Sequence, residues 1–265
     1  MSRSLWRGLN GIFPVLKPHG VTSAQLLNNI KEKLTEEFCS GDKSTIKMGH
    51  GGILDSTATG VLVVGIGKDC KNLKFFLNSE KCYFVRGQLG VATDTHNEIG
   101  QIMMERRYDH VTENMLQERL KDFEGRIKQT PPLYSALKKD GKRYSDLARE
   151  GIDIEIQPRF VHCYELKLSE FNPPYFALTV SCGPGFYIRS LIHDLGQVVG
   201  SCAHVRELQR TKQGPFHIKD ALSENQWNVE HISWCIDKWR GKLKKYFLSA
   251  DKWYYGKRMK IKLHS

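Results

Sequence analysis

The sequence predicts an α/β protein in which short apolar strands alternate with amphipathic helices. Residues 61–64 form a continuous apolar run, which is typical of a buried strand. Residues 176–182 place apolar side chains at every second position, as in a strand with one buried face. Leucine and isoleucine recur with helical spacing between residues 26 and 34. The two periods together indicate a fold that mixes both kinds of element.

The expected elements follow one another along the chain. They are a strand at 12–16, a turn at 17–20, a helix after 22, strands at 61–64 and 83–89, a helix from 112, a strand at 176–182 and a helix at 188–199. Thr22 and Gln25 have the spacing of a capping box, and Thr112 can cap the second helix. Residues 36–44 are expected to form a surface loop.

Charge and cysteine content restrict the partners and the compartment. The 265 residues include 40 Lys and Arg against 29 Asp and Glu, a net charge of +11 that favours a polyanion such as nucleic acid. The seven cysteines are scattered, as expected of free thiols in a reducing compartment. No apolar stretch is long enough for a bilayer, so nucleus or cytoplasm is expected, and Arg3 and Arg7 keep a mitochondrial location open.

One carboxylate stands out in the segment Gly49-His50-Gly51-Gly52-Ile53-Leu54-Asp55. Asp55 follows a glycine-rich corner and precedes the apolar run at 61–64. Glycines permit a tight turn and the close approach of a ligand, and an apolar anchor limits the water around the acid. The alternative is that Asp55 is a turn residue bonded to its own backbone. On this motif alone both interpretations stay open.

Several other chemistries are weakened by missing residues. His96-Asn97-Glu98 matches the first half of a zinc deaminase pattern, but the chain has no P-C-x-x-C for the remaining ligands. Residues 65–68 resemble a phosphate loop without its full spacing. No G-x-S-x-G marks an acyl-transfer serine. One acid, several tyrosines, an arginine at a helix start and a basic surface suit a reaction on RNA that consumes no cofactor.

Five further blocks of sequence are spread over residues 12–218. They are Lys17-Pro18-x-Gly20 with Thr22-Ser23; Gly49 to Gly52 continuing to Gly60-Val61-Leu62; Lys81-x-Tyr83 with Gly90-x-x-Thr93-Asp94-Thr95; Gln129-x-Pro131-Pro132-x-Tyr134-Ser135-Ala136-x-Lys138; and Gly185-x-Tyr187-Ile188-Arg189-Ser190-Leu191 with Asp194-Leu195-Gly196 and Leu208-x-Arg210. In these motifs and their order the chain resembles the TruB-type tRNA pseudouridine synthases, and among them the eukaryotic members. Bacterial members have proline after the catalytic acid, whereas Ser56 follows it here.

The resemblance implies a pseudouridine synthase fold, α/β (α+β), with a central mixed, largely antiparallel sheet flanked by helices and loops and a cleft for an RNA hairpin. It implies an isomerase that converts uridine 55 in the T arm of tRNA into pseudouridine after flipping the base out of its stack. No metal or cofactor is implied. Expected partners are the tRNA T stem-loop, with messenger or other structured RNA as further candidates, and the chain is expected to be a monomer.

The resemblance also assigns catalytic roles to three residues. Asp55 corresponds to the catalytic aspartate, which attacks the ribose or assists elimination. Tyr83 corresponds to a tyrosine that stacks on the flipped base. Arg189 corresponds to an arginine that pairs with the aspartate and keeps it ionised.

Four further residues correspond to binding positions of the family. Tyr187 and Leu208 match the lining of the uracil pocket, and Lys17 matches a lysine that supports the catalytic loop. His50 matches a histidine that keeps the displaced nucleotides apart. On their own, these residues would be interpreted as ordinary turn, strand or core residues.

We expect residues 1–218 to form the catalytic domain and residues 219–265 a basic, aromatic extension too short for a typical PUA domain. That extension is either a solvated face or a contact to RNA. Residues 129–159, named here the flap segment, are expected to form a mobile cationic flap that closes over RNA. The alternative to an isomerase is an RNA-binding or RNA-folding protein that does not require Asp55.

Overall fold

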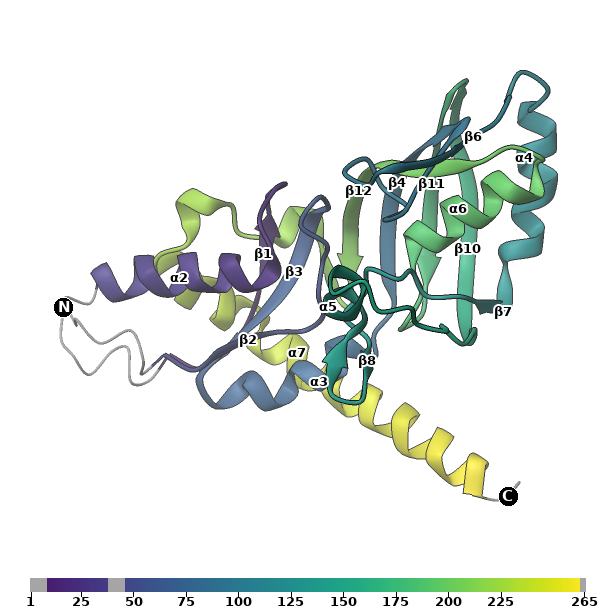
Figure 1. The fold of residues 1–265 in the computed structure, drawn as a ribbon. Helices are drawn as coiled ribbons and strands as arrows, with labels where there is room; N and C mark the ends of the chain where they lie inside the picture. Colours follow the sequence, from purple (N-terminus) through teal and green to yellow (C-terminus); the bar gives the residue numbers. More distant parts are fainter. Residues whose placement is uncertain (1–8, 38–45, 263–265) are drawn as a thin grey trace. The chain divides into compact units, whose positions relative to one another are not determined.

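The computed structural model describes residues 9–37 and 46–262, with side chains as far as residue 250. The chain divides into two compact units, which Figure 1 shows with their helices and strands labelled. The first unit comprises residues 1–79 and 210–265, and the second comprises residues 80–209. Strand β12 begins in the second unit and ends in the first.

The first unit combines a small antiparallel sheet with helices. Its elements are β1 (Gly11–Lys17), α2 (Ser23–Glu37), β2 (Met48–His50), β3 (Thr59–Ile66), a 3-10 helix (Gly67–Asn72), α3 (Leu73–Leu77), the end of β12 (Ala203–Gln213), β13 (Phe216–His217), two short 3-10 helices (Ile218–Asp220 and Glu224–Gln226) and α7 (Val229–Lys262). The strand order is β1-β3-β12, with β2 beside β3 and β13 beside β12. Strand β1 is antiparallel to β3, and this register places Lys17 opposite Gly60.

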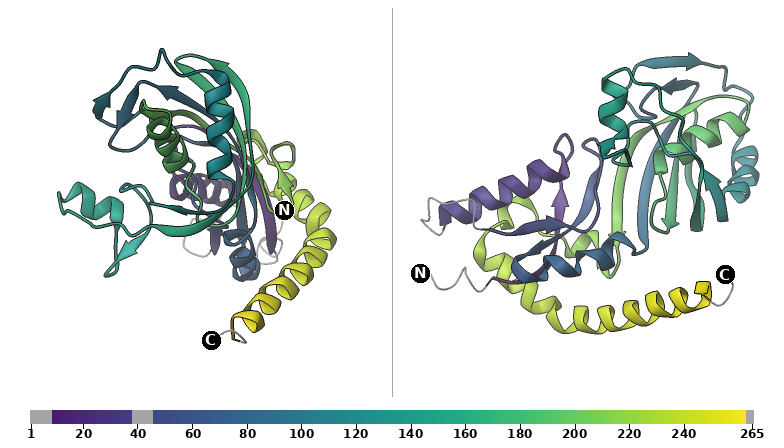
Figure 2. Two further views of the ribbon diagram at one scale, coloured as in Figure 1. Left: turned by 90° about the vertical axis from the view of Figure 1, so that its right-hand side faces the viewer. Right: turned by 60° about the horizontal axis from the view of Figure 1, so that its bottom comes forward.

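Helix α7 has 34 residues and forms most of the C-terminal segment. It packs against β1, and Figure 2 shows it in full. Its buried side chains share one helical face and are Ile232, Cys235, Ile236, Trp239 and Leu243. A Cβ atom on Gly11 would lie only 2.3 Å from the Ile236 side chain, so glycine is needed where the helix crosses the strand.

Aromatic side chains of α7 pack against phenylalanine rings of the first unit. The Trp239 ring lies 4.5 Å from Phe216, and the Tyr246 ring lies 5.6 Å from Phe76. The ring of Phe247 is 5.9 Å from Phe76. These three side chains of α7 are therefore used for packing, and stacking on RNA bases by the extension stays a prediction for the side chains beyond residue 250.

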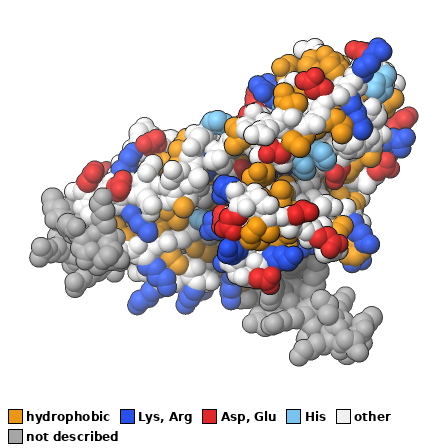
Figure 3. All heavy atoms as spheres, viewed as in Figure 1, with side chains coloured by type: hydrophobic (Ala, Val, Ile, Leu, Met, Phe, Trp, Pro, Cys, Tyr) orange, Lys and Arg blue, Asp and Glu red, His pale blue; other side chains and the backbone are white. Residues whose placement is uncertain are grey.

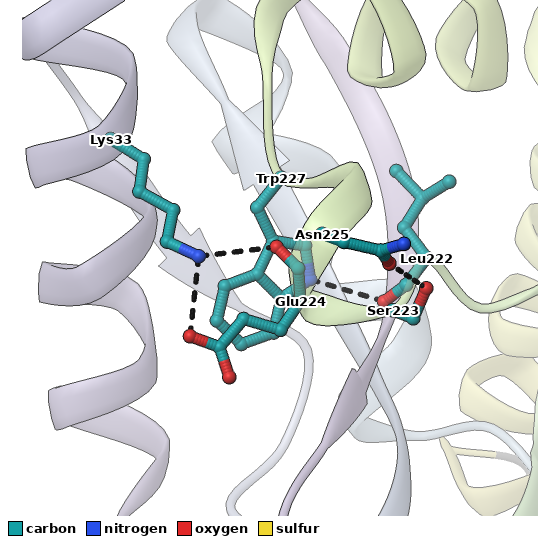
Figure 4. Close-up of polar contacts among 6 residues, drawn as sticks. All are labelled: Lys33, Leu222, Ser223, Glu224, Asn225 and Trp227. Atoms are coloured by element: carbon teal, nitrogen blue, oxygen red, sulfur yellow. Dashed lines mark hydrogen bonds and ion pairs between the residues drawn. The ribbon is translucent and has the colours of Figure 1, made fainter.

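Polar contacts connect α2 to the segment before α7, as Figure 4 shows. The Lys33 ammonium lies 3.2 Å from both the Glu224 carboxylate and the Glu224 carbonyl oxygen, and 5.3 Å from the centroid of the Trp227 ring. The buried Trp227 indole donates to the Leu222 carbonyl at 3.1 Å. The indole bond satisfies a buried donor, whereas the exposed ion pair contributes little.

The sheet strands of the second unit follow the order β12-β4-β11-β10-β7, and the pairs β4-β11, β11-β10 and β10-β7 are antiparallel. Its elements are β4 (Lys81–Leu89), β5 (Val91–Thr93), β6 (Ile102–Glu105), α4 (Glu113–Leu120), a 3-10 helix (Lys121–Phe123), β7 (Gly125–Gln129), β8 (Lys138–Lys139), β9 (Lys142–Arg143), α5 (Tyr144–Arg149), β10 (Arg159–Asn172), β11 (Tyr175–Cys182) and α6 (Ile188–Val198). Helix α4 contacts β10 and α6, α6 contacts β4, and both helices lie against this sheet in Figure 2.

These elements confirm the predicted α/β class with a largely antiparallel sheet flanked by helices. The capping box also forms: Thr22 N–H donates to the Gln25 side chain at 2.9 Å, and Gln25 N–H donates to the Thr22 hydroxyl at 3.2 Å. The Thr112 hydroxyl accepts from Met115 N–H. Of the longer elements, strands β10 and β12 and helix α7 were not predicted. Of the loop expected at 36–44, Glu36 and Glu37 belong to α2, and the rest lies outside the described residues. No helix among the described residues has the length and apolar character to cross a membrane.

The flap segment contains the β8-β9 hairpin and α5, and it has a small hydrophobic cluster of its own. Tyr144, Leu147 and Ile154 are its buried members. Lysines at its tip are exposed, as predicted, but Lys142 pairs with Glu150 at 3.0 Å. Figure 3 shows Lys and Arg side chains interspersed with acidic ones on this face. The mobility of the segment stays a prediction.

Candidate functional site

Asp55 lies in a loop, residues 51–58, that connects β2 to β3; we call it the Asp55 loop. The carbonyl of Asp55 accepts a hydrogen bond from Ala58 N–H at 3.1 Å, which closes a turn just after the acid. One residue earlier, the buried Ser23 hydroxyl donates to Leu54 O at 3.1 Å and accepts from Leu54 N–H at 3.0 Å. The backbone is therefore fixed on both sides of the carboxylate.

Lys17 lies at the end of β1 and its side chain is fully buried. Its ammonium donates to the carbonyls of Pro18 at 2.7 Å, Val21 at 2.6 Å and Ser56 at 3.1 Å. Burial lowers the pKa of Lys17 to about 8, Asp55 raises it and Arg210 lowers it further. Lys17 thus contacts the backbone next to Asp55, and its supporting role in the reaction stays a prediction.

His50 ends β2 and is partly exposed. Its Nδ1 atom accepts a hydrogen bond from Gly52 N–H at 3.4 Å. Burial lowers the pKa of His50, and Arg210 lowers it further, so the neutral imidazole is favoured. The side chain is therefore oriented by the same glycine corner that leads to Asp55.

Glycines of this corner, and Gly60 at the start of β3, are required by contacts within the protein. A Cβ atom on Gly51 would lie 2.6 Å from Phe76, and one on Gly60 would lie 2.2 Å from the Arg210 carbonyl oxygen. Gly52 has φ +142° and Gly60 has φ +111°, conformations that other residues rarely adopt. The sequence predicted that these glycines let a ligand come close. In the structure, neighbouring backbone and side-chain atoms of the protein itself lie close to them.

Tyr83 and Arg189 belong to the second unit. Tyr83 is buried on β4, in register with Val180 of β11. Arg189 is buried in the first turn of α6, where its guanidinium donates to Thr95 O at 3.0 Å and to Tyr134 O at 2.9 Å. Two loops that are distant in sequence are thus bound by one side chain, and Arg189 has a fixed orientation.

Tyr187 immediately precedes α6, and Gln129 binds its backbone from both sides. The buried Gln129 amide donates to Tyr187 O at 2.9 Å, and its carbonyl accepts from Tyr187 N–H at 2.8 Å. The Ser190 hydroxyl donates to Thr130 O at 2.7 Å. The Gln-x-Pro-Pro block therefore fixes the start of α6. Leu208, the remaining predicted pocket residue, is half-buried on β12.

In the His-Asn-Glu segment at 96–98, the histidine ring packs against a second histidine. The His96 ring stacks on His193 with centroids 4.0 Å apart. Burial, His193 and Arg189 lower the pKa of His96 to about 3, so the imidazole is neutral. In the part of the chain that the structure describes, no group of three or more His, Cys, Asp or Glu side chains could bind a metal ion.

The structure brings Lys17, His50 and Asp55 to one loop of the first unit, and it places Tyr83, Tyr187, Arg189 and Leu208 on elements of the second. Sequence reasoning assigned no role to Arg210, Gln213 or Gln129, whose buried side chains bind backbone near the predicted site residues. Arg210 and Gln129 did lie within quoted motifs, which was the available signal. A single sequence does not show which polar residues of a strand are buried.

Two protein-family models match this chain, and together they cover residues 41–252. A family model described as the TruB family pseudouridylate synthase N-terminal domain matches residues 41–188. A second, described as the tRNA pseudouridylate synthase B C-terminal domain, matches residues 189–252. The chain belongs to the TruB family of pseudouridylate synthases.

Two relatives illustrate the range of similarity. Pseudouridylate synthase TRUB1 of Homo sapiens is 48% identical over 238 residues, which cover 86% of this chain and 68% of that protein. tRNA pseudouridine synthase B of Haemophilus influenzae is 37% identical over 224 residues, covering 84% of this chain and 69% of that protein.

Solved structures agree on the fold. A chain of a Cbf5-Nop10-Gar1 complex matches with a TM-score of 0.59 and 28% identity over 82% of this chain. A chain of an H/ACA RNP bound to a substrate RNA containing 2'-deoxyuridine matches with a TM-score of 0.57 and 26% identity, also over 82% of this chain. The match spans about half the length of those two chains, 53% and 51%.

Proposed function

We propose that this protein is a tRNA pseudouridine synthase that isomerises uridine 55 in the T arm of tRNA. The observation that carries the proposal is the Asp55 loop, whose backbone is held by hydrogen bonds on both sides of a single carboxylate. Membership of the TruB family and the names of the relatives in human and bacteria support the reaction class.

The reaction needs no redox partner. The bond from ribose C1′ to uracil N1 breaks, the uracil turns, and C5 forms the new bond to C1′. The proton lost from C5 is balanced by the proton gained at N1, so substrate and product are isomers. An ionised Asp55 serves either as the nucleophile at C1′ or as the base for an elimination route, and both routes depend on the same carboxylate.

The other predicted residues complete the proposal. Tyr83 stacks on the flipped uracil, and Arg189 pairs with Asp55. Tyr187 and Leu208 line the uracil pocket, with His50 between the displaced nucleotides. The neutral imidazole of His50 suits packing between bases.

The substrate we propose is the T stem-loop, and the net charge of +11 favours binding of its phosphates. The flap segment, with exposed lysines at its tip, closes over the bound hairpin. One similar structure contains a substrate RNA, which supports an RNA substrate here.

The test compares the wild type with Asp55→Ala and Asp55→Asn on a T-arm stem-loop RNA. Pseudouridine is mapped at base resolution, and RNA affinity is measured in parallel. We expect turnover to fall by about 10⁴-fold or more in both variants, with affinity retained. A control RNA with cytidine at position 55 should give no product. Retained turnover in Asp55→Ala would exclude the mechanism, and wild-type binding without turnover would support the RNA-binding alternative.

A further inference from the structure

Arg210 is buried in β12, with 1% of its surface exposed, and it binds backbone on both sides of Asp55. Its Nε donates to Val61 O at 2.7 Å, just after the loop. Its Nη1 donates to Ile53 O at 3.2 Å and its Nη2 to Gly52 O at 3.3 Å, both within the loop. One planar cation therefore connects three carbonyls that flank the acid.

Gln213 lies three residues further along β12 and is completely buried. Its Nε2 donates to Gly51 O at 2.7 Å and to Phe76 O at 3.3 Å, and its Oε1 accepts from Val63 N–H at 3.4 Å. Both amide hydrogens and the amide oxygen are thus engaged. Gln213 binds the carbonyl immediately before those that Arg210 binds.

The neighbouring carbonyls of the loop are bonded as well. Leu54 O accepts from Ser23, Asp55 O from Ala58 N–H, and Ser56 O from both Lys17 and Gly20 N–H. With the contacts of Arg210 and Gln213, every carbonyl from residue 51 to residue 56 has a donor. This complete set fixes the peptide planes that determine where the Asp55 side chain leaves the backbone.

We propose that Arg210 and Gln213 are positioning residues, which act through the backbone of the Asp55 loop to place the carboxylate for reaction. The proposal rests on the proposed function. Both side chains are buried, so they act without touching RNA. A displacement of about 1 Å in a catalytic group can lower the rate about 100-fold. A shift of the loop backbone would displace the Asp55 carboxylate in this way.

The substitutions Arg210→Lys and Gln213→Met separate positioning from simple stability. Lysine keeps the positive charge and aliphatic stem but cannot direct donors to three carbonyls at once. Methionine keeps the approximate length of Gln213 and removes its amide. We expect the single-turnover rate on saturating T-arm RNA to fall about 100-fold in Arg210→Lys and about 10-fold in Gln213→Met. The RNA dissociation constant should stay within about threefold in both, because neither residue reaches the RNA.

Trp227→Phe provides the matched control. It also removes one buried side-chain donor to a carbonyl in the same unit, but its partner is Leu222, outside the loop. We expect this variant to lose stability and to keep the single-turnover rate of the folded protein. Unchanged rates in folded Arg210→Lys and Gln213→Met would overturn the proposal, as would an equal rate loss in Trp227→Phe. If Arg210→Lys does not fold, Gln213→Met decides.

Hydrogen exchange of the loop amides gives a second readout that needs no turnover. Gly51 N–H bonds to Val63 O at 2.8 Å and Leu54 N–H to Ser23 at 3.0 Å, so both should be protected in the wild type. We expect exchange at these amides to become about 10-fold faster or more in Arg210→Lys and not in Trp227→Phe. No product from the wild type would count against the proposed function alone. Unaltered loop exchange together with an unaltered rate in the variants would count against the positioning role alone.

Discussion

The Asp55 loop and the flap segment are both built from turns and short connections, but different forces stabilise them. In the Asp55 loop, buried side chains bind the backbone, including the fully buried Lys17 and Gln213. In residues 138–159 of the flap segment, the hairpin strands have two residues each, and the buried side chains belong to a small local cluster around Leu147. The ion pairs Lys142–Glu150 and Arg149–Asp146 in this segment are solvent-exposed.

The contrast has a consequence for dynamics and for function. Opening the Asp55 loop would leave buried donors and two buried cations without partners, which makes the opening costly. Opening residues 138–159 of the flap segment would expose only three buried side chains, those of Tyr144, Leu147 and Ile154. A fixed loop suits a carboxylate that must be aligned with one bond, whereas a loosely attached segment suits admission of an RNA hairpin.

The largest expected effect is that of Gly60→Ala. A Cβ atom there would lie 2.2 Å from the Arg210 carbonyl oxygen, and φ is +111°. We expect the free energy of unfolding to fall by about 3 kcal/mol or more, measured by chemical denaturation. Gly141→Ala in the flap segment is the control, because φ is +85° and nothing lies within 4 Å. Its loss should be about 1 kcal/mol. Equal losses in the two variants would contradict the close approach at Gly60.

The second prediction concerns the pH dependence of Lys17→Met. Burial places the folded-state pKa of Lys17 at about 8, below the ordinary lysine value of 10.5, so between these two pH values the unfolded chain binds more protons than the folded protein. The stability of the wild type relative to Lys17→Met should therefore rise with pH, by about 2 kcal/mol from pH 7 to pH 9.5. Denaturation curves of both proteins across that range measure it. A difference that stays constant or falls would contradict the burial of this cation.

A smaller global effect is expected from Leu147→Ala in the flap segment. Leu147 is 8% exposed and belongs to the local cluster, so its truncation should open that segment and reduce global stability by less than about 1 kcal/mol. Leu116→Ala on α4 removes a completely buried leucine from the main packing of the second unit, and it should cost about 2–4 kcal/mol. Similar losses would show that the flap segment unfolds together with the rest.

The smallest expected effect is that of Lys33→Ala. The side chains of Lys33 and Glu224 are 40% and 61% exposed, so their ion pair should contribute about 0.5 kcal/mol or less to stability. Denaturation at low salt and at 1 M salt should show that this contribution nearly vanishes when charges are screened. A loss above about 2 kcal/mol would indicate that Lys33 acts mainly through its contact with the Trp227 ring.

Local patterns in the sequence predicted much of this molecule. The caps at Thr22 and Thr112 formed as expected, because capping depends on residues only three positions apart. The place of Lys17 beside the Asp55 loop followed from the family resemblance. The contacts of Arg210 could not be predicted, because they join segments about 150 residues apart. Helix α7 was not predicted, because the many Lys and Arg residues from 238 onward obscure the apolar positions with helical spacing, such as Ile232 and Ile236.

Native-state hydrogen exchange of the wild type tests the contrast most directly. Leu54 N–H in the Asp55 loop and Tyr144 N–H in the flap segment both have described partners, at 3.0 Å and 2.8 Å. Differences in exchange between them therefore report how each region opens. We expect the Leu54 amide to be protected about 100-fold more than the Tyr144 amide, with T-arm RNA slowing exchange more in the flap segment than in the Asp55 loop. Equal protection of the two amides would contradict the account of a fixed loop and a loosely attached segment.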